Sequence, residues 1–348
     1  MPPYGIPAIT VLMPVYNAAP FLRAAVDSIL NQSFGDFEFL IINDGSTDDS
    51  AAILTSYADA RIRVVHNERN LGITAALNRG LRLARAELVA RQDADDVSLP
   101  TRLGVQMAFL RNHPDVVLLG TRGTCISRDG RKLHPIGSPA TDAVSIRWVL
   151  CFENPFIHGA TIFRRGPVVT DLGGYDPGLP YCEDFGLWSK LAGVGPVANL
   201  PDRLVLYREH SASLMATMPA TLPRERACVL KATLLATFPG RRLSTADLEL
   251  LNYLPRGPRR SESAAFLRLV GLLLADYVTA NPEARRSSSF SQTVASQYAS
   301  LAALLARHKD PATLVAGWQA LCWSPAGALA VFTRAVRRRL RWTHKTGQ

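Results

Sequence analysis

The chain of 348 residues predicts an α/β fold with a mostly parallel sheet flanked by helices, followed by a helical C-terminal region. Two observations carry this prediction. Up to about residue 210, short apolar runs alternate with segments of helical period, which is the spacing of strand–helix–strand units with parallel strands. From about residue 223, Ala- and Leu-rich helical segments between Pro and Gly breakers replace the strands. We therefore expect two domains, at residues 1–222 and 223–348.

Four apolar runs are the predicted strands of the first half of the sheet. Those at residues 9–13, 37–42 and 88–90 consist mainly of apolar residues, as expected of buried strands, and the run at 62–65 is predicted as a further strand. Segments of helical period separate them, at residues 20–31, from residue 47 onward, and at 74–84. The second of these begins with Thr47, Asp48 and Asp49, which favour a helix N-terminus.

The remaining elements of the first domain are less regular. Helices are predicted at residues 100–112, 142–150 and 183–191, and strands at 116–120, 160–163 and 204–207. Residues 125–134 indicate a hairpin around Asp129-Gly130, because Asp-Gly favours the tight turn between two antiparallel strands.

The composition argues against several classes of protein. A hydrophobic content of 47% supports a packed core and argues against general disorder. The five cysteines lie far apart without a Cys-x-x-Cys pair, which suits a reducing cytoplasm and predicts no zinc framework. The sequence does not open with a charged segment followed by an apolar one, so we expect no secretion signal and a cytoplasmic protein.

The net charge of +10 is carried by the C-terminal third of the chain. Residues 224–348 hold 19 Lys and Arg against 7 Asp and Glu, and six of the basic residues lie at 334–345. The 22 uncharged residues 312–333 precede this tail, but Gln319 and Pro325 interrupt them, so we expect two short helices rather than a membrane span. The tail is expected on the anionic inner face of the membrane. A solvated basic helix is the alternative, and no motif indicates nucleic acid as a partner.

The most informative stretch follows the fourth predicted strand and reads Arg91-Gln92-Asp93-Ala94-Asp95-Asp96. Three carboxylates within four residues repel one another, and burial at the end of a strand strengthens the repulsion. A divalent cation such as Mn²⁺ or Mg²⁺ removes it, because these ions prefer oxygen ligands from carboxylates and substrate phosphates. An acidic surface turn before a helix is the alternative for a motif this short.

Polar residues follow three of the predicted parallel strands at the point where each strand ends. They are the segments Pro14–Asn17, Asn43–Ser46 and Asp93–Asp96. In open sheets of this kind, ligands bind beyond the carboxyl ends of the strands. The three segments are therefore expected to converge on one crevice.

Six motifs in this order resemble those of family 2 glycosyltransferases, over roughly residues 8–215. They are Pro14-Val15-Tyr16-Asn17, Asn43-Asp44-Gly45-Ser46-Thr47-Asp48, Asn70-Leu71-Gly72, Asp93-Ala94-Asp95-Asp96, Glu183-Asp184 with Leu187-Trp188, and Tyr207-Arg208-Glu209-His210. The resemblance implies a GT-A fold and an inverting transfer of a hexosyl or N-acetylhexosaminyl group from a nucleoside diphosphate, with UDP favoured. The acceptor it implies is a hydroxyl of a glycan or of a lipid-linked glycan.

The resemblance also implies roles on the donor side. The donor-binding residues would be Pro14, Tyr16, Asn17, Asp44, Asn70, Gly72, Asp93 and Ala94. Asp44 looks like the aspartate that accepts from a pyrimidine imide, with a helix N-cap as the alternative, and Asp93 looks like the ribose contact. Asp95 looks like the metal ligand. His210 is similar to a second ligand or diphosphate contact, although a single His is more often structural.

Asp184 is the residue expected to act as the general base. In-line inversion needs one carboxylate on the face of C1 opposite the leaving diphosphate, to take the proton of the attacking hydroxyl, and no second catalytic carboxylate. Acceptor-side or supporting positions are expected at Asp96, Glu183, His158 and Trp188. The alternatives are an acidic helix start for Glu183-Asp184 and buried structural roles for His158 and Trp188.

Two other functions are compatible with parts of this pattern. A nucleotidyltransferase that makes nucleotide sugars also combines such a sheet with metal-binding acids, but those enzymes resemble one another in a Gly-rich phosphate loop where this chain has Pro14–Asn17. A non-catalytic nucleotide-sugar-binding protein would keep the fold, but it needs no base such as Asp184. The Gln-x-x-Arg-Trp motif of processive synthases does not occur in the sequence, so we expect single transfers.

Overall fold

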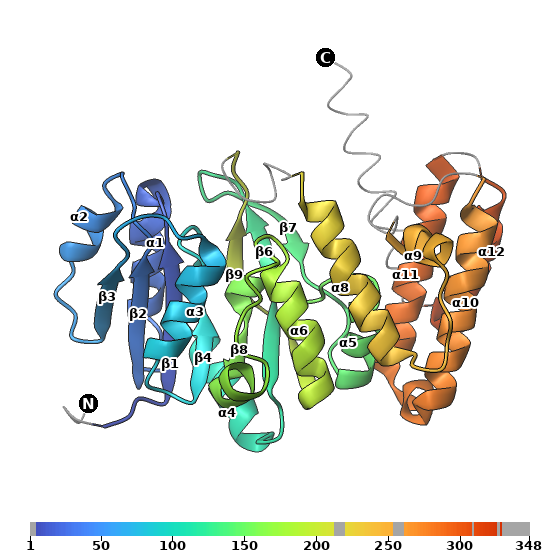
Figure 1. The fold of residues 1–348 in the computed structure, drawn as a ribbon, viewed down its shortest axis with the longest axis horizontal. Helices are drawn as coiled ribbons and strands as arrows, with labels where there is room; N and C mark the ends of the chain where they lie inside the picture. The colour runs from blue at the N-terminus through green and yellow to red at the C-terminus, as the bar shows by residue number, and fades with distance from the viewer. Residues whose placement is uncertain (1–4, 212–219, 253–260, 308–309, 326–327, 329–348) are drawn as a thin grey trace, which may run out of the picture. The chain divides into compact units, whose positions relative to one another are not determined.

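The computed structural model describes residues 5–211, 220–252, 261–307, 310–325 and 328, which belong to two compact units (Figure 1). The first unit comprises residues up to 138 together with 155–225, and the second comprises 139–154 together with the residues from 226 onward. Residues 139–154 thus belong with the C-terminal helices rather than with the sheet. The functional division at residue 222 remains a prediction.

Four parallel strands form the first half of the sheet, in the order β3-β2-β1-β4. They are β1 (Ile9–Val15), β2 (Phe37–Asn43), β3 (Ile62–His66) and β4 (Leu88–Arg91), and they alternate along the chain with α1 (Ala19–Leu30), α2 (Ser50–Thr55) and α3 (Ile73–Leu83). The apolar side chains of β1, β2 and α1 share one core, which is why these strands read as continuous apolar runs. The predicted α/β class is confirmed.

The second half of the same sheet is mixed. β8 (Ile162–Arg164) is antiparallel to β4 and to β6 (Leu118–Ile126), and β6 is parallel to β9 (Val197–Arg208). β5 (Val97–Ser98) pairs with β9, and β7 (Lys132–Ile136) forms the predicted hairpin with β6. The helical elements of this half are α4 (Arg102–Asn112), η1 (His158–Ala160), η2 (Pro167–Asp171) and α6 (Glu183–Val194).

The largest difference from the sequence prediction concerns β9. The sequence predicts a strand only at 204–207, whereas β9 begins at Val197. Its middle residues, Pro201 to Arg203, are exposed, and the pairing with β6 shifts its register opposite them. Exposed polar residues interrupt the apolar pattern on which the prediction depends, so the first part of the strand is missed.

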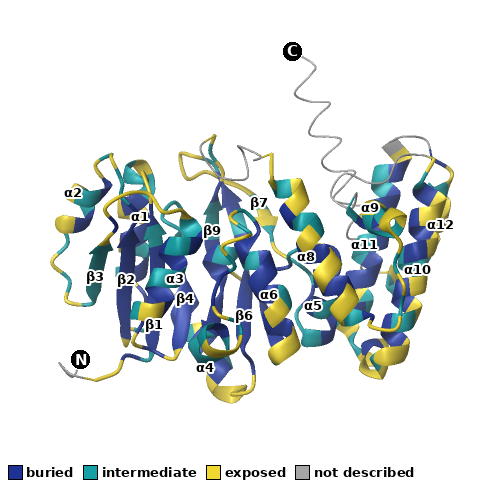
Figure 2. Cartoon of the chain, in the orientation of Figure 1, coloured by how far each residue is buried: buried dark blue, intermediate teal, exposed yellow. Residues whose placement is uncertain are grey.

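The described part of the second unit consists of helices. They are α5 (Ala143–Leu150), most of α8 (Leu222–Thr237), α9 (Thr245–Asn252), α10 (Ser263–Ala280), η3 (Pro282–Arg286), α11 (Ser288–Arg307) and α12 (Ala312–Trp323). Aromatic rings form its centre: the ring of Tyr277 lies 5.3 Å from that of Trp148 and stacks on Phe290 at 5.7 Å. In Figure 2 the inner faces of these helices are buried while their outer faces are exposed, so this unit has a core of its own.

One helix of the described chain is long and apolar enough to cross a membrane, by length and composition alone. It is α10, with 18 residues and a mean hydropathy of 1.5, and 44% of it is buried inside the structure. A helix of a protein core has the same composition. In the uncharged stretch 312–333, α12 ends at Trp323. The basic tail 334–348 lies outside the described residues.

Candidate active site

Hydrogen bonds hold together the loops that follow β1 and β2. Asn17 has a left-handed backbone conformation, with φ of 48°. Its N–H donates to Ser46 Oγ at 3.1 Å, and its Oδ1 accepts from the Thr47 N–H at 2.9 Å. The segments Pro14–Asn17 and Asn43–Ser46 therefore lie side by side beyond the carboxyl ends of the two strands.

Asp44 ties a third loop to these two. Its buried carboxylate accepts from the N–H groups of Leu71 at 3.1 Å and Gly72 at 2.9 Å. The same carboxylate accepts from Asn67 Nδ2 at 2.5 Å. The loop after β3 is thus fixed against the loop after β2 by a charged acceptor, which makes strong hydrogen bonds.

Two further contacts define this loop. Gly45 has φ of +67°, and a Cβ there would overlap the backbone of the loop after β3, so only glycine fits. Asn70 Oδ1 accepts from the Gly72 N–H at 2.8 Å. Helix α2 begins at Ser50, so Asp44 does not serve as its N-cap.

The first two carboxylates of the acidic cluster, Asp93 and Asp95, have charged or polar partners behind them. Asp93 Oδ1 accepts from Arg91 Nη2 at 2.7 Å, and Asp95 Oδ2 lies 2.9 Å from His210 Nε2. The side chains of Asp93 and Asp95 are 27% and 31% exposed, whereas those of Arg91 and His210 are more deeply buried. Both carboxylates therefore stay accessible to a ligand.

Asp96 is the buried member of the cluster. Its Oδ1 accepts from the Arg208 N–H at 2.8 Å, and its Oδ2 has no hydrogen-bond partner among the described residues. Arg208 Nε donates to the carbonyl of Asp95 at 2.8 Å, so the end of β9 is tied to the cluster. The ring of Phe21 packs against the Arg208 guanidinium and against the His210 ring, at 5.1 and 4.6 Å.

Burial and mutual repulsion act together on the pKa values of the cluster. Burial, and then the Asp93 charge, raise the pKa of Asp95, and the same causes together with Asp95 raise the pKa of Asp96 well above its usual value. Burial disfavours the charged form of a carboxylate, and neighbouring carboxylates add to the shift. Asp95 Oδ2 and His210 Nε2 are the candidate ligands for Mn²⁺ or Mg²⁺, and Asp96, whose Oδ2 is unpartnered, belongs to the same cluster.

A buried polar network lies directly behind the cluster, and the sequence analysis did not find it. Arg102 of α4 donates to Gln92 Oε1 at 3.0 Å, to Ser98 Oγ at 2.8 Å, and to the carbonyls of Arg91 and Thr161 at 2.7 and 3.1 Å. Burial lowers the pKa of Arg102 to about 9. The acidic cluster could be predicted because a polar run follows a strand. The helical pattern around Arg102 does not distinguish this residue from an exposed arginine.

The hydroxyl of Tyr175 lies where the acidic cluster approaches the start of α6. This side chain is buried, and burial raises its pKa. Arg91 opposes that shift, whereas Glu183, Asp184 and Asp93 add to it. The half-buried Asp184 and the Asp93 carboxylate therefore both lie within electrostatic reach of one hydroxyl, although they are distant in the sequence.

His158 connects Tyr175 to Glu183. Its Nε2 lies 3.1 Å from the Tyr175 hydroxyl and its Nδ1 lies 3.7 Å from Glu183 Oε1. Burial, and then Arg91, lower the pKa of His158 well below its usual value. Burial, and then the Asp184 charge, raise the pKa of Glu183 to about 8. Both shifts favour the neutral forms of the two side chains.

The other predicted site residues differ in exposure. Trp188 is fully buried, and its ring packs against Phe163 at 5.4 Å and His158 at 5.9 Å. Tyr16 is 48% exposed, and the remaining predicted residues Pro14 and Ala94 are partly buried. Gly159, which the sequence analysis did not select, has a positional role: a Cβ there would overlap Asp93 Oδ2. The turn at His158–Ala160 thus leaves room for the acidic cluster.

Comparison with known sequences identifies relatives of this chain. Residues 10–172 match the model of glycosyl transferase family 2. An amylovoran biosynthesis glycosyltransferase of Erwinia amylovora is 34% identical over 208 residues, which are 58% of this chain and 76% of the relative. An O-antigen biosynthesis glycosyltransferase of Escherichia coli is 32% identical over 210 residues, which are 59% of this chain and 81% of the relative.

Solved structures share the fold along most of the chain. TarS 1–349 of S. aureus, in complex with UDP-GlcNAc, has a TM-score of 0.57 at 16% identity, over 93% of this chain and 91% of that one. The mannosyltransferase PcManGT of Pyrobaculum calidifontis, in complex with GDP-Man and Mn²⁺, has a TM-score of 0.51 at 20% identity, over 95% and 87%. The sequence relatives show the family, and the solved structures show the fold. The chain belongs to glycosyltransferase family 2 and has the GT-A architecture.

Proposed function

We propose that this protein is an inverting glycosyltransferase that moves a sugar from a nucleoside-diphosphate sugar, with UDP favoured, to a hydroxyl of a glycan or lipid-linked glycan. One observation carries the proposal: the turn at His158–Ala160 lies against both groups, because a Cβ on Gly159 would overlap Asp93 Oδ2, and His158 Nδ1 lies 3.7 Å from Glu183, the neighbour of Asp184. A carboxylate base and a set of metal-ligand candidates thus approach one volume. Transfer from a diphosphate to a hydroxyl needs these two functions at a short distance from each other.

The donor nucleotide would lie against the three joined loops. In this proposal Asp44 accepts the imide N–H of a pyrimidine, Asp93 contacts the ribose, and Tyr16, Asn17 and the Asn70–Gly72 loop complete the donor side. Asp44 already holds that loop through Leu71 and Gly72, but a carboxylate offers about four acceptor positions in all. The hydrogen bonds between the loops support this role because they fix the site before a ligand arrives.

Asp95 and His210 would hold a divalent cation, Mn²⁺ or Mg²⁺. The cation would supply Lewis-acid stabilisation of the leaving diphosphate. Asp95 Oδ2 and His210 Nε2 hydrogen-bond to each other at 2.9 Å, and two neighbouring ligands of one cation would lie at a similar separation, which supports this pair. Arg208 holds the cluster in place through the Asp95 carbonyl and the Asp96 carboxylate. The Mn²⁺ in the Pyrobaculum neighbour agrees with the choice of metal.

Asp184 would take the proton of the acceptor hydroxyl as it attacks. Its Oδ1 accepts from the Phe185 N–H at 2.6 Å, which fixes the carboxylate at the first turn of α6. Burial raises the pKa of Glu183 next to it, which favours a neutral neighbour for the base. One base on the face opposite the leaving group is sufficient for inversion, and no covalent intermediate is needed.

The names of the relatives support a class of acceptor. Two are named for amylovoran and O-antigen biosynthesis, and the S. aureus neighbour binds UDP-GlcNAc. We therefore favour a hexosyl or N-acetylhexosaminyl transfer in the synthesis of a cell-envelope polysaccharide, on the cytoplasmic side of the membrane.

Helix α12 supports a peripheral location at that membrane. It carries no charged residue, and Leu314 and Trp318 are 80% and 67% exposed. Exposed apolar side chains on a helix are typical of the membrane interface, where Trp is enriched. Deleting residues 334–348, which hold six basic residues, is expected to reduce flotation with anionic vesicles but not with neutral ones. Unchanged binding to anionic vesicles would contradict the role of the tail.

A donor screen tests the proposed function. Thermal unfolding is measured with UDP-, GDP- and TDP-sugars, with and without Mn²⁺. We expect one nucleotide class to stabilise the protein in the presence of Mn²⁺, by about 2.7 kcal/mol at a ligand concentration of 100 Kd. The stabilising donor is then assayed for release of nucleoside diphosphate. Donor binding without turnover would indicate a binding protein, and formation of nucleotide sugar from a nucleoside triphosphate would indicate a nucleotidyltransferase.

A further inference from the structure

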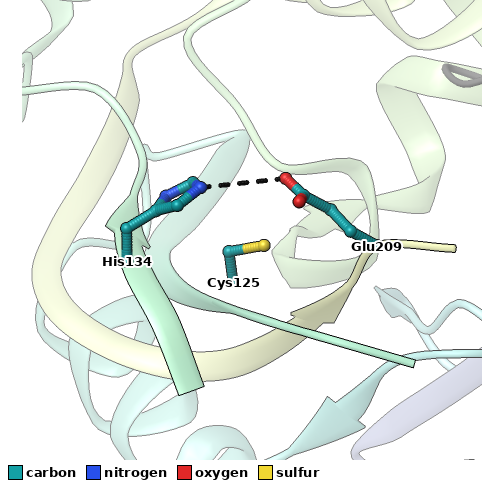
Figure 3. Close-up of side chains that lie close together, drawn as sticks. All are labelled: Cys125, His134 and Glu209. Atoms are coloured by element: carbon teal, nitrogen blue, oxygen red, sulfur yellow. Dashed lines mark ion pairs between the residues drawn. The ribbon is translucent and has the colours of Figure 1, made fainter. Parts of the chain in front are cut away.

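Cys125, His134 and Glu209, none of which belongs to the acidic cluster, come together at one point (Figure 3). Cys125 and His134 are direct cross-strand partners on β6 and β7. Glu209 follows β9, which pairs with the other edge of β6, and its N–H donates to the Ile126 carbonyl at 2.9 Å. Two strands and the residue that follows a third thus contribute one side chain each. The three residues share no short motif, which explains why the sequence predicts no zinc framework.

The donor atoms of these side chains are spaced nearly as a bound zinc ion requires. One ligand atom from each lies within 4.8 Å of the other two, and His134 Nε2 is 3.8 Å from Glu209 Oε1. Metal–ligand bonds of about 2.0–2.3 Å in a tetrahedral arrangement place neighbouring donors roughly 3.5 Å apart. Small side-chain rotations close the difference, because the His134 and Glu209 side chains are 42% and 55% exposed. Cys125 is buried and supplies a fixed ligand.

We propose that Cys125, His134 and Glu209 bind a thiophilic divalent cation of the Zn²⁺ type, with a fourth position open to water. A thiolate, an imidazole and a carboxylate are all zinc ligands. Mg²⁺ and Mn²⁺ prefer oxygen donors, so this site and the Asp95–His210 pair would select different ions. On binding, the Cys125 sulfur forms a bond to the cation and its thiol proton leaves to solvent.

The position of Glu209 links this site to the acidic cluster. Its two chain neighbours both reach Asp95: Arg208 Nε donates to the Asp95 carbonyl at 2.8 Å, and His210 Nε2 lies 2.9 Å from Oδ2. Successive side chains of an extended segment point to opposite sides, which accounts for Glu209 facing Cys125 instead. A cation held by Glu209 would therefore also fix the backbone that carries His210. Only this link rests on the proposed function, since cation binding itself does not depend on it.

The test uses the full-length protein with Cys228→Ser and Cys322→Ser, which removes the two exposed thiols among the described cysteines. After bound metals are removed with a chelator, Co²⁺ is added and the thiolate-to-cobalt charge-transfer absorption is recorded. Competition with Zn²⁺ then gives the zinc affinity. We expect one equivalent of Co²⁺ to produce this absorption and Zn²⁺ to displace it.

Variants of the three proposed ligand residues test whether they bind the cation. His134→Ala and Glu209→Gln alter half-exposed side chains, so both should fold, and each is expected to weaken Zn²⁺ binding by about tenfold or more. Cys125→Ser should remove the charge-transfer absorption, whereas the matched control Asp95→Asn should keep it. A parent protein without this absorption, or an unchanged Zn²⁺ affinity in both half-exposed variants, would overturn the site. Donor binding that does not respond to Zn²⁺ would overturn only the link to His210.

Discussion

Both units have an apolar core, but the first unit also buries charged side chains, whereas aromatic rings form the centre of the second. Behind the acidic cluster, the first unit buries Arg91, Arg102 and Asp96, each at or below 1% exposure. The second unit buries rings such as Trp148 and Phe290. A buried charge depends on partners in fixed directions, whereas an apolar core depends mainly on filled volume. The buried charges of the first unit hold carboxylates in defined positions. The ring core of the second unit stabilises the fold and needs no partners in fixed directions.

This difference indicates how residues of each unit should be tested. Charged groups that are held against repulsion store free energy that a ligand can release, so their substitution should appear mainly in binding and turnover. Aromatic rings in a packed core bind no ligand. Their substitution should therefore lower mainly the free energy of unfolding. The family match agrees with this division, since it covers residues 10–172 and so lies mostly in the first unit.

The largest expected effect is on turnover, from Asp184→Asn. Loss of the general base should lower the rate of transfer by about 10²–10⁴, while donor and Mn²⁺ affinity stay unchanged because the variant leaves the acidic cluster intact. Initial rates and calorimetry measure the two quantities. Asp95→Asn is the matched variant on the metal side, and it should abolish Mn²⁺-dependent donor binding. Near-normal turnover in Asp184→Asn would reject this residue as the base.

The corresponding test in the second unit is Trp148→Ala. Removing a fully buried ring that contacts Phe152, Tyr277 and Phe290 should lower the free energy of unfolding by about 3–5 kcal/mol, as measured by denaturant titration. The rate of transfer should stay normal at temperatures where the variant is folded. Trp318→Ala provides the control, because that ring is 67% exposed and its loss should change stability by less than about 0.5 kcal/mol. Equal losses in both variants would contradict the proposed core.

Local patterns account for what the sequence predicts correctly. The strands β1, β2 and β4 are buried on both sides of the sheet, so each appears as an apolar run with a polar segment at its end. β3 lies at the end of the sheet and is only partly buried. The grouping of Pro14–Asn17 with Asn43–Ser46 follows from parallel pairing alone, and the structure shows the contact. The same rule predicts a crevice at this edge but not which side chains support it.

Pairings between distant segments account for what the sequence does not predict. Arg102 lies in a helix whose pattern does not reveal that it meets Gln92 and Thr161. Cys125 and Glu209 are brought together by the register of β6 against β9, which shifts at a place that no local motif marks. Such registers depend on the packing of the whole sheet, so the residues that meet across them are visible only in the structure.

A smaller effect is expected at Gly159, where the absence of a side chain leaves space for the Asp93 carboxylate. In Gly159→Ala the new Cβ would displace the Asp93 carboxylate, so the affinity for UDP with Mn²⁺ should fall by about tenfold, as measured by calorimetry. The control is Gly193→Ala in α6, where a Cβ has no neighbour within 4 Å. An unchanged affinity in Gly159→Ala would show that Asp93 needs no fixed position.

The effect expected from Glu183→Gln is a change in the pH dependence of stability. The folded protein raises the pKa of Glu183 to about 8, from 4.5 for an unperturbed glutamate, so between these values the folded state keeps a proton that the unfolded state has lost. Its contribution to stability is therefore fully present below pH 4.5 and is lost as the pH rises toward 8, at about 1 kcal/mol per pH unit.

Glutamine cannot ionise, so it should remove this slope, and the free energy of unfolding of Glu183→Gln minus that of the wild type should increase from pH 5 to pH 8. Denaturant titrations at several pH values measure the difference. His158→Gln changes the partner of Glu183 without removing its carboxyl group, and it should retain most of the slope. A constant difference between Glu183→Gln and wild type would mean that Glu183 is ionised in the folded protein. Asp184 would then act beside a second negative charge. The first unit would bury one more carboxylate that has no charged partner.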